Sequence, residues 1–369
     1  MLPGQYNVSD EEYNRIVTQH VTELWTNYGP MTEIWIDSPL QTPQHTETNT
    51  TTDPYTYTDF VELMERLQPN AAGTPRRNPR EWCGTESGHP SRDVGPGPIW
   101  QTGTGSHGDP TAMQWVDKFC DPQLFQQPSL WFWEPHQPIR ALTDLIPIYH
   151  DIVGRGMIME LAVAITREGV IAAEHATVYQ QLGDWVRTCY GQPVVEAALA
   201  AARVVAASSP PQHDIVRLVL PPGSEFDRIM ISEDISFGQR IRNYTVSIII
   251  EDTNLLSSSS STSTIVLVSN GTSVGRKRIH VFPKIYSTIA STIQEEEERQ
   301  QQYQHLSESS KISTTVTVLM NITKSIATPQ LKLLGLYGPC FPRRNDENNN
   351  DKDIIILSKT RTTSTISTT

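Results

Sequence analysis

The chain has 369 residues, of which 37% are hydrophobic and 8% aromatic, and its formal net charge is -12 at pH 7. This length and composition can bury a sizeable core and favour two globular domains. The acidic balance argues against a nucleic-acid partner, because phosphate contacts need a surplus of Lys and Arg on one face. The one basic cluster, Arg276-Lys277-Arg278, is interpreted as a solvated turn or strand edge.

The N-terminal segment predicts a helix, a tight turn and a buried strand. Residues 9–12 (SDEE) have the pattern of a capping box, and apolar residues at helical spacing follow to about residue 27. Gly29 and Pro30 end that helix. Residues 33–37 (EIWID) read as a short apolar strand that ends in a carboxylate. This order of elements is typical of an α/β unit.

Further α/β elements are expected up to about residue 189. Residues 58–67, 142–153 and 173–189 are predicted helices, and residues 156–164 are a predicted buried strand. Residues 70–138 are expected to form one long loop rich in Gly, Pro and Trp. Loops of that length are uncommon in compact domains unless they are functional, so this segment is interpreted as an active-site wall.

From about residue 213 the pattern changes to short strand-like runs separated by turns, which predicts a β-sandwich. Polar low-complexity inserts at 257–264 and 295–302 are expected to be loops. We therefore divide the chain into a catalytic region at 1–205, a C-terminal β-sandwich at 213–341 and a disordered polar tail at 342–369. The predicted strands cover residues 214–220, 227–232, 244–251, 263–269, 278–282, 313–321 and 331–337.

Two carboxylates are candidates for catalysis. Asp37 stands at the carboxyl end of a predicted strand, where α/β barrels place their active sites, although Asp also commonly ends strands as a turn residue. Glu86 lies between Gly84 and Gly88 and near Trp82, whose side chain can desolvate the carboxyl. Desolvation raises the pKa of a carboxyl, as a general acid requires. Taken alone, a Glu in such a position is more often a solvated loop residue.

Aromatic and polar side chains of the long loop are candidate substrate contacts. His107 and Asp109 stand in the segment His-Gly-Asp-Pro, and Trp131 and Trp133 flank Phe132. Aromatic faces stack on sugar rings, but clusters of Trp more often pack in cores. Each of these signals is weak by itself.

Several motifs in one order carry more weight than any of them singly. Residues 22–29 (TELWTNYG), 33–37 (EIWID) and 82–88 (WCGTESG) are followed by 107–110 (HGDP) and 131–133 (WFW). This order resembles the α-L-fucosidases of glycoside hydrolase family 29, with the 82–88 loop similar to that of the plant-like branch. Segments such as 271–279 (GTSVGRKRI) resemble landmarks of that family's C-terminal domain, so the resemblance covers roughly residues 6–340.

The resemblance implies an α/β plus all-β protein: a partial (β/α)8 TIM-like barrel lacking its first strands, followed by a galactose-binding-like β-sandwich. It implies a retaining hydrolysis of terminal α-linked L-fucose, with Asp37 as nucleophile, Glu86 as acid/base and a fucosylated glycan as partner. The two carboxyls of such a pair lie about 5–5.5 Å apart. No cofactor and no metal are implied. The implied substrate-binding residues are Trp35, His107, Asp109, Trp131 and Trp133.

The sequence also departs from the family pattern. About three further barrel strands are expected before the segment seen here, residues 126–130 replace a stretch in which the family has an Arg, and Glu160 stands where an apolar residue is usual. A buried unpaired Glu costs several kcal/mol or is neutralised. These departures predict a truncated chain with little or no activity. A non-catalytic carbohydrate-binding remnant and a pseudoenzyme are the alternatives.

Cysteines and targeting signals bear on the compartment. The four cysteines include no Cys-x-x-Cys pair, so neither a zinc site nor a dense disulfide scaffold is indicated, and one or two disulfides stay open. No apolar run reaches the roughly 18 residues of a membrane span, so no membrane partner is expected. No signal peptide is recognised, although the family is extracellular or lysosome/vacuole-like. Acceptor triplets of a secreted glycoprotein occur at Asn7, Asn49, Asn243, Asn270 and Asn321.

Overall fold

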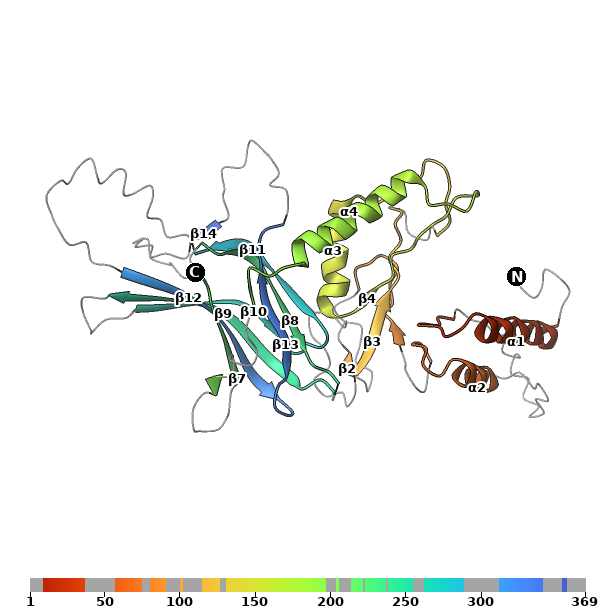
Figure 1. Cartoon of the computed structure of the whole chain (residues 1–369), viewed down its shortest axis with the longest axis horizontal. Helices are drawn as coiled ribbons and strands as arrows, with labels where there is room; N and C mark the ends of the chain where they lie inside the picture. The colour runs from red at the N-terminus through yellow and green to blue at the C-terminus, as the bar shows by residue number, and fades with distance from the viewer. Residues whose placement is uncertain are drawn as a thin grey trace, which may run out of the picture. The chain divides into compact units, whose positions relative to one another are not determined.

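The computed structural model describes thirteen segments of the chain, which divides into two compact units (Figure 1). The first unit comprises residues 1–82 and 116–118, and the second comprises residues 83–115 and 119–369. The described segments are 9–36, 57–74, 80–90, 100–101, 115–126, 131–196, 204–205, 214–221, 223–236, 238–254, 262–288, 312–340 and 354–356.

The first unit is built on two helices, α1 (Asp10–Asn27) and α2 (Tyr57–Leu67). The predicted start of α1 is confirmed, because the Ser9 hydroxyl accepts a hydrogen bond from the Glu12 amide at 3.2 Å. The apolar faces of the helices meet where Trp25 and Phe60 pack edge to face, with ring centroids 5.4 Å apart. Buried Gln68 closes the turn after α1, since its Nε2 donates to the Trp25 carbonyl at 2.6 Å.

The predicted strand at 33–37 is much shorter than expected. It is reduced to one parallel bridge between Glu33 and Ala72, flanked by backbone hydrogen bonds of 2.9 Å from Ile34 N to Ala72 O and from Ala72 N to Thr32 O. Gly73 then turns the partner segment with a φ of +89°, so the pairing ends after one residue. A Cβ on Gly73 would lie 2.1 Å from the Ile34 carbonyl oxygen, so this close approach needs glycine.

The predicted loop at 70–138 is interrupted by three strands, β1 (Arg80–Trp82), β2 (Trp100–Gln101) and β3 (Trp115–Cys120). Strand β3 was not predicted because charged residues interrupt its apolar pattern. Lys118 in β3 is 4% exposed and pairs with Glu81 in β1, with Nζ 3.5 Å from the carboxylate. An ion pair between buried Lys118 and partly exposed Glu81 thus joins neighbouring strands, in place of the apolar alternation by which a strand is recognised in sequence.

The second unit begins with an α/β segment, as predicted. Strand β3 leads to helix α3 (Leu142–Ile152), the short 3-10 helix η2 (Val153–Arg155) and strand β4 (Ile158–Met159), and helix α4 (Ala173–Tyr190) follows. Strands β3 and β4 are parallel, with Phe119 opposite Ile158. The predicted strand at 156–164 is therefore shorter than expected, although the Glu160 amide still donates to the Cys120 carbonyl at 2.8 Å. The shared core comprises Cys83, Cys120, Leu124, Leu145, Ile148, Ile152, Met157 and Val178.

All four cysteines form disulfides, which answers the question that their spacing leaves open. Cys83 and Cys120 join the segment after β1 to the end of β3, with Cα atoms 5.2 Å apart. Cys189 and Cys340 join the end of α4 to the segment after the last core strand, with Cα atoms 5.4 Å apart. Both bonds connect elements of the second unit.

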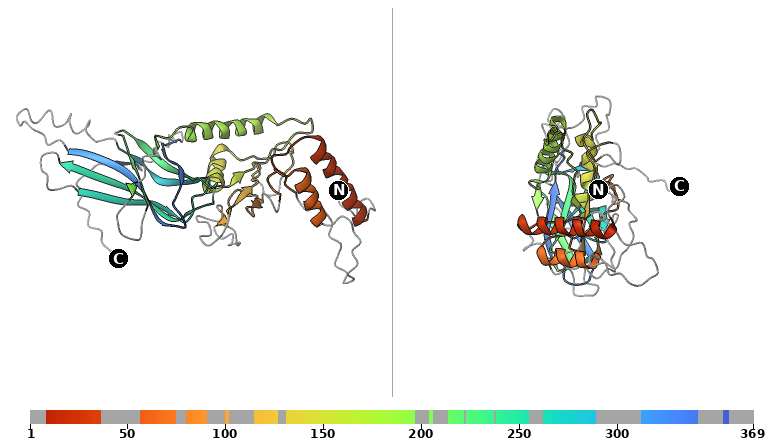
Figure 2. Two further views of the ribbon diagram at one scale, coloured as in Figure 1. Left: turned by 60° about the horizontal axis from the view of Figure 1, so that its bottom comes forward. Right: turned by 90° about the vertical axis from the view of Figure 1, so that its right-hand side faces the viewer.

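The predicted β domain is confirmed, because two five-stranded sheets enclose one apolar core (Figure 2). One sheet has the order β10-β9-β12-β7-β6 and the other the order β14-β11-β8-β13-β5. Alternation along β9 places Tyr244, Val246 and Ile248 in the core. The strands are β5 (Val195–Glu196), β6 (Val204–Val205), β7 (Asp214–Val219), β8 (Glu225–Glu233), β9 (Ile241–Asn254), β10 (Thr262–Gly271), β11 (Arg278–Ser287), β12 (Ile312–Ser325), β13 (Leu331–Tyr337) and β14 (Ile354–Ile356).

The sequence does not predict β5, β6 and β14, because two or three residues show no detectable period. β14 lies inside the segment expected to be a polar tail and pairs in parallel with β11. The basic cluster at residues 276–278, expected to be solvated, is only partly so. Arg276 is exposed, but Arg278 opens β11 and is 3% exposed, so the solvated interpretation is wrong for Arg278.

The two helices of the second unit pack on its β domain through aromatic side chains. Tyr149 of α3 meets Trp185 of α4 edge to face, with centroids 5.4 Å apart. Tyr190 at the end of α4 contacts Tyr337 of β13, also at 5.4 Å. The buried Arg228 guanidinium lies 5.0 Å from the centroid of the Tyr190 ring. The helices and the sheets are therefore joined by a continuous core as well as by a disulfide.

Candidate active site

Glu86 is carried by the loop at residues 83–90, which follows β1. Gly84 and Gly88 both have positive φ, 84° and 85°, the left-handed conformation that glycine adopts without strain. A Cβ on Gly88 would come within 2.6 Å of the Ile148 side chain, so this end of the loop lies directly on α3. A side chain is therefore sterically excluded at Gly88, whereas a Cβ on Gly84 would have nothing within 4 Å.

The Glu86 carboxyl is partly buried and held by Gln123. The Gln123 Nε2 donates to Glu86 Oε2 at 3.1 Å, and the Gln123 amide donates to the Glu86 carbonyl at 3.4 Å. Gln123 is 1% exposed and follows the end of β3, so it belongs to the core rather than to the loop. This contact orients the carboxyl through one oxygen, Oε2, as an acid/base group requires.

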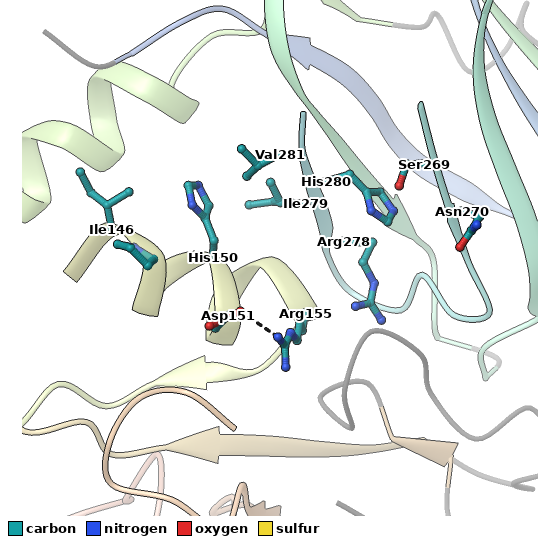
Figure 3. A pocket seen from close by; sticks show the side chains of 11 residues that line it. Ile146, His150, Asp151, Arg155, Ser269, Asn270, Arg278, Ile279, His280 and Val281 are labelled. Atoms are coloured by element: carbon teal, nitrogen blue, oxygen red, sulfur yellow. Dashed lines mark hydrogen bonds and ion pairs between the residues drawn. The ribbon is translucent and has the colours of Figure 1, made fainter. Parts of the chain in front are cut away.

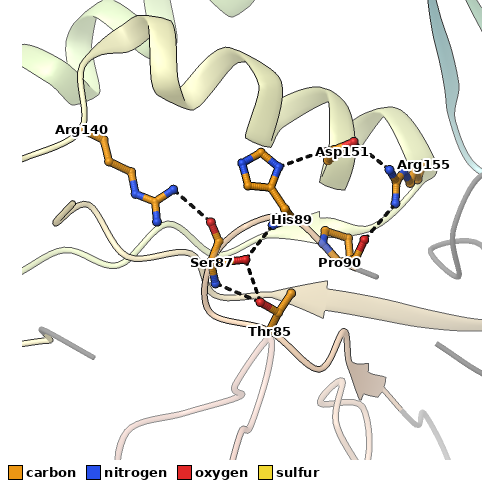
Figure 4. A network of polar contacts seen from close by, with 7 residues as sticks. All are labelled: Thr85, Ser87, His89, Pro90, Arg140, Asp151 and Arg155. Atoms are coloured by element: carbon orange, nitrogen blue, oxygen red, sulfur yellow. Dashed lines mark hydrogen bonds and ion pairs between the residues drawn. The ribbon is translucent and has the colours of Figure 1, made fainter. Parts of the chain in front are cut away.

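A chain of polar contacts anchors the rest of the loop to α3 (Figure 4). The Thr85 and Ser87 hydroxyls are 2.8 Å apart, and the His89 amide donates to the Ser87 hydroxyl at 3.2 Å. The His89 Nδ1 lies 2.7 Å from Asp151 Oδ2, and Arg155 donates to Asp151 Oδ1 at 2.7 Å. One carboxylate of α3 therefore holds both the loop and an arginine.

Arg140 connects the Glu86 loop to the segment that carries the tryptophans. Its Nη1 donates to the Ser87 carbonyl at 2.9 Å and its Nε to the Phe125 carbonyl at 3.2 Å. Burial lowers the pKa of Arg140 from its ordinary value. Residues 124–126 and 138–140 pair through backbone hydrogen bonds, and Arg140 ties this paired segment to Ser87. Arg140 thus brings a guanidinium to this loop although residues 126–130 contain no Arg.

The predicted substrate contacts are only partly described. Trp131 and Trp133 lie in the described segment that leads to residues 138–140 and are half-buried, while Phe132 between them is 85% exposed. Trp35 belongs to the first unit and is 54% exposed. Asp37, His107 and Asp109 lie outside the described residues. The separation expected between the Asp37 and Glu86 carboxyls therefore stays a prediction.

Sequence reasoning missed the groups that position Glu86. Gln123 stands three residues after Cys120, and no local pattern indicates which carboxyl its side-chain amide contacts. Two further contacts of this loop also join residues more than fifty positions apart: Arg140 with Ser87, and His89 with Asp151. Within the described segments, no group of three or more His, Cys, Asp or Glu can hold a metal ion. None of the described helices is long and apolar enough to cross a bilayer.

Comparison with known proteins gives a consistent group of relatives. A sequence profile described as Alpha-L-fucosidase matches residues 2–191. The chain is 26% identical over 310 residues to "Putative alpha-L-fucosidase 1" of Oryza sativa subsp. japonica, covering 74% of this chain and 55% of the relative. It is 23% identical over 201 residues to "Alpha-L-fucosidase 1" of Arabidopsis thaliana, covering 51% of this chain and 37% of the relative. The chain thus spans about half or less of these curated relatives.

A solved structure shares the fold. The GH29 fucosidase of Ruminococcus gnavus in complex with fucose superimposes with a TM-score of 0.59 at 16% identity, covering 92% of this chain and 67% of that chain. At this identity the likeness concerns the fold alone.

Proposed function

Because this chain belongs to the alpha-L-fucosidase family, we propose that it is a retaining α-L-fucosidase that releases terminal α-linked L-fucose from glycans. The observation that carries the proposal is the Glu86 carboxyl, held by buried Gln123 on a loop that the family profile covers. In this proposal residues 1–205 form part of a (β/α)8 barrel, and residues 213–341 form a galactose-binding-like sandwich. Active sites of such barrels lie where strands end, as Glu86 and Gln123 do.

The proposed reaction has two steps. Asp37 attacks the anomeric carbon and forms a glycosyl ester, while Glu86 gives its proton to the departing glycosidic oxygen. The Glu86 carboxylate then takes a proton from water, whose oxygen attacks the same carbon and releases Asp37. Two displacements at one carbon give net retention of configuration. The products are L-fucose and the shortened glycan.

The remaining predicted residues contact the sugar in this proposal. Trp131 and Trp133 supply partly exposed aromatic surface on residues 131–137, which lead to Arg140 and its contact with the Glu86 loop. Apolar faces of sugar rings stack on such surfaces. Trp35, His107 and Asp109 complete the proposed contacts.

The test is hydrolysis of an aryl α-L-fucoside by the purified chain and by Asp37→Ala and Glu86→Ala. Turnover by the parent chain should be slow, as the departures from the family pattern predict, and it should vanish in Asp37→Ala. In Glu86→Ala, azide should restore release of the activated aryl group by attacking the glycosyl ester, and the fucosyl azide should keep the α configuration. An inverted azide from Glu86→Ala contradicts the role of Glu86 as acid/base. Binding of fucosylated glycan without turnover identifies the chain as a non-catalytic remnant and overturns the proposal.

We also propose an extracellular or lysosome/vacuole-like compartment. Two disulfides among the described residues support this, because such bonds persist in oxidising compartments. Among the acceptor triplets, Asn243 and Asn270 have exposed side chains and are the proposed glycosylation sites. Secretion from a eukaryotic host with a mass decrease on glycan removal tests this, and loss of that decrease in the double variant Asn243→Gln/Asn270→Gln assigns the sites.

A further inference from the structure

A cavity of about 720 Å³ lies between α3 with η2 on one side and strands β10 and β11 on the other (Figure 3). All of these elements belong to the second unit. The volume lies within the range of small-molecule sites, roughly 300–1,000 Å³. Its polar lining includes His150, Asp151, Arg155, Asn270, Arg278 and His280.

Arg278 is the unusual member of this lining. It is 3% exposed, and its hydrogen bonds go to one neutral residue: Nε donates to the Ser273 carbonyl at 3.2 Å and Nη2 to the Ser273 hydroxyl at 2.8 Å. Among the described residues no carboxylate forms an ion pair with Arg278. Burial lowers the pKa of Arg278, and the positive charge of Arg155 lowers it further. A buried guanidinium without a counter-ion is unfavourable, and an anion in the cavity relieves that cost.

The other charged groups of the cavity do not neutralise Arg278. Asp151 is the one carboxylate of the lining, and it is already engaged by Arg155 at 2.7 Å and by His89 at 2.7 Å. His150 is uncharged at neutral pH, because burial lowers its pKa to about 4, with a further contribution from Arg228. The lining therefore contains two positively charged guanidiniums, Arg155 and Arg278, and one carboxylate, Asp151. Figure 3 shows both arginine side chains in the lining of this cavity.

We propose that this cavity binds an oxyanion, the carboxylate or sulfate group of an acidic saccharide or a free inorganic oxyanion. Arg278 is the principal contact, because a guanidinium matches the geometry of two oxygens and the Nη1 group is not used by Ser273. Arg155 adds positive charge from the facing wall, and Ser269 of β10 offers a neutral hydrogen-bonding group. The site is separate from Glu86 and does not depend on the proposed hydrolysis.

The experiment is isothermal titration of the full chain, produced in an oxidising bacterial compartment that adds no N-glycans, at constant ionic strength set with chloride. The probes are sodium glucuronate, sodium sulfate and uncharged glucose. We expect saturable binding of glucuronate, of sulfate or of both, and none of glucose. Tighter binding of glucuronate assigns an acidic saccharide, whereas sulfate without glucuronate assigns an inorganic oxyanion.

Three variants locate the site. Arg278→Gln removes the principal charge and should weaken binding at least tenfold. Ser269→Phe fills the cavity, keeps both arginines and should weaken binding as strongly, which covers the case in which Arg278→Gln does not fold. Arg276→Gln removes the same charge from an exposed side chain outside the lining and should bind as the parent does. Absence of oxyanion binding, binding of glucose as tight as that of glucuronate, or equal weakening in Arg276→Gln overturns the proposal.

Discussion

Gln123 holds Glu86 from a neighbouring strand end, through a side-chain hydrogen bond of 3.1 Å and a backbone hydrogen bond of 3.4 Å. The amide is buried and the carboxyl is partly exposed, so the support is rigid and the reactive group is accessible. The position of the proposed acid/base is therefore determined by a residue 37 positions away in sequence.

Replacing Gln123 tests this support through the kinetics of aryl fucoside hydrolysis. Gln123→Leu should lower kcat about tenfold, about 1.4 kcal/mol of transition-state stabilisation, with little change in KM, because the carboxyl is no longer oriented. Gln123→Glu places a like charge beside Glu86, which raises the pKa of the pair and should move the alkaline limb of the pH profile upward. Gln126→Leu removes an exposed glutamine of the same segment and is the control. A lowered kcat in that control, or unchanged kinetics in both Gln123 variants, argues against the positioning role.

Local patterns in the sequence predicted the helices and most of the β domain. The capping residue Ser9 and the helical apolar spacing placed α1 at residues 10–27, and the structure confirms both ends. The strands around the sandwich core were found because their alternation is repeated over several residues, as in β9 and β12. These signals depend on neighbours in sequence.

What could not be predicted depends on partners far apart in the chain. Strand β3 was predicted as loop because Lys118 is charged, whereas in the structure its ion pair with Glu81 allows Lys118 to be buried. The partner of Cys83 is likewise decided by the fold, since four cysteines allow three pairings. In the candidate site the sequence proposed Glu86, but Gln123 as its support required the structure.

Gly73 should be intolerant of any side chain. In Gly73→Ala the new Cβ would lie 2.1 Å from the Ile34 carbonyl oxygen at a φ of +89°, so both a clash and backbone strain oppose it. Gly29 has a similar φ of +83°, and nothing lies within 4 Å of a new Cβ there. Gly29→Ala therefore measures the backbone strain without the clash. We expect a loss of about 1 kcal/mol in Gly29→Ala and at least about 3 kcal/mol in Gly73→Ala by urea unfolding. Equal losses would show that the close backbone approach is not maintained in solution.

The disulfide between Cys83 and Cys120 should stabilise the Glu86 loop and the chain as a whole. The double variant Cys83→Ser/Cys120→Ser should lose about 2–4 kcal/mol of unfolding free energy, because the unfolded chain is no longer closed between residues 37 positions apart. The variant should also show faster amide exchange at residues 84–89. A matched pair, Cys189→Ser/Cys340→Ser, should leave exchange in that loop unchanged. Protection of the loop that is identical in all three proteins contradicts the anchoring role.

Buried His150 should make the fold sensitive to acid. Its pKa is lowered to about 4, chiefly by burial, and its Nε2 lies 2.6 Å from the Tyr190 hydroxyl. The unfolded chain binds this proton near pH 6.5 and the folded chain only near its lowered pKa, so stability should fall as the pH drops through that window. His150→Gln should flatten the fall measured by urea unfolding, at a cost of about 1 kcal/mol near neutral pH. A fall of undiminished size in this variant would assign the acid sensitivity to other groups.

Buried Glu233 should make the fold more stable as the pH falls, which is the opposite of the effect of His150. It is 2% exposed, its Oε1 accepts from the Arg240 amide at 2.7 Å and the Ile241 amide at 3.1 Å, and burial raises its pKa to about 7. The folded chain therefore binds the proton more tightly than the unfolded chain, whose carboxyl titrates near 4.5, and stability should rise as the pH falls from above about 7 toward 4.5.

Glu233→Gln imitates the protonated carboxyl, because the amide oxygen can still accept both backbone hydrogen bonds. Its unfolding free energy should match that of the parent at acidic pH and exceed it by up to about 3 kcal/mol at alkaline pH. Glu225→Gln makes the same charge change at a partly buried position of β8 and controls for net charge. If the advantage of Glu233→Gln is the same at every pH, or if Glu225→Gln reproduces its pH dependence, the titration does not belong to Glu233. If Glu233→Gln has a higher unfolding free energy than the parent at alkaline pH only, the ionised form of Glu233 is the destabilising one.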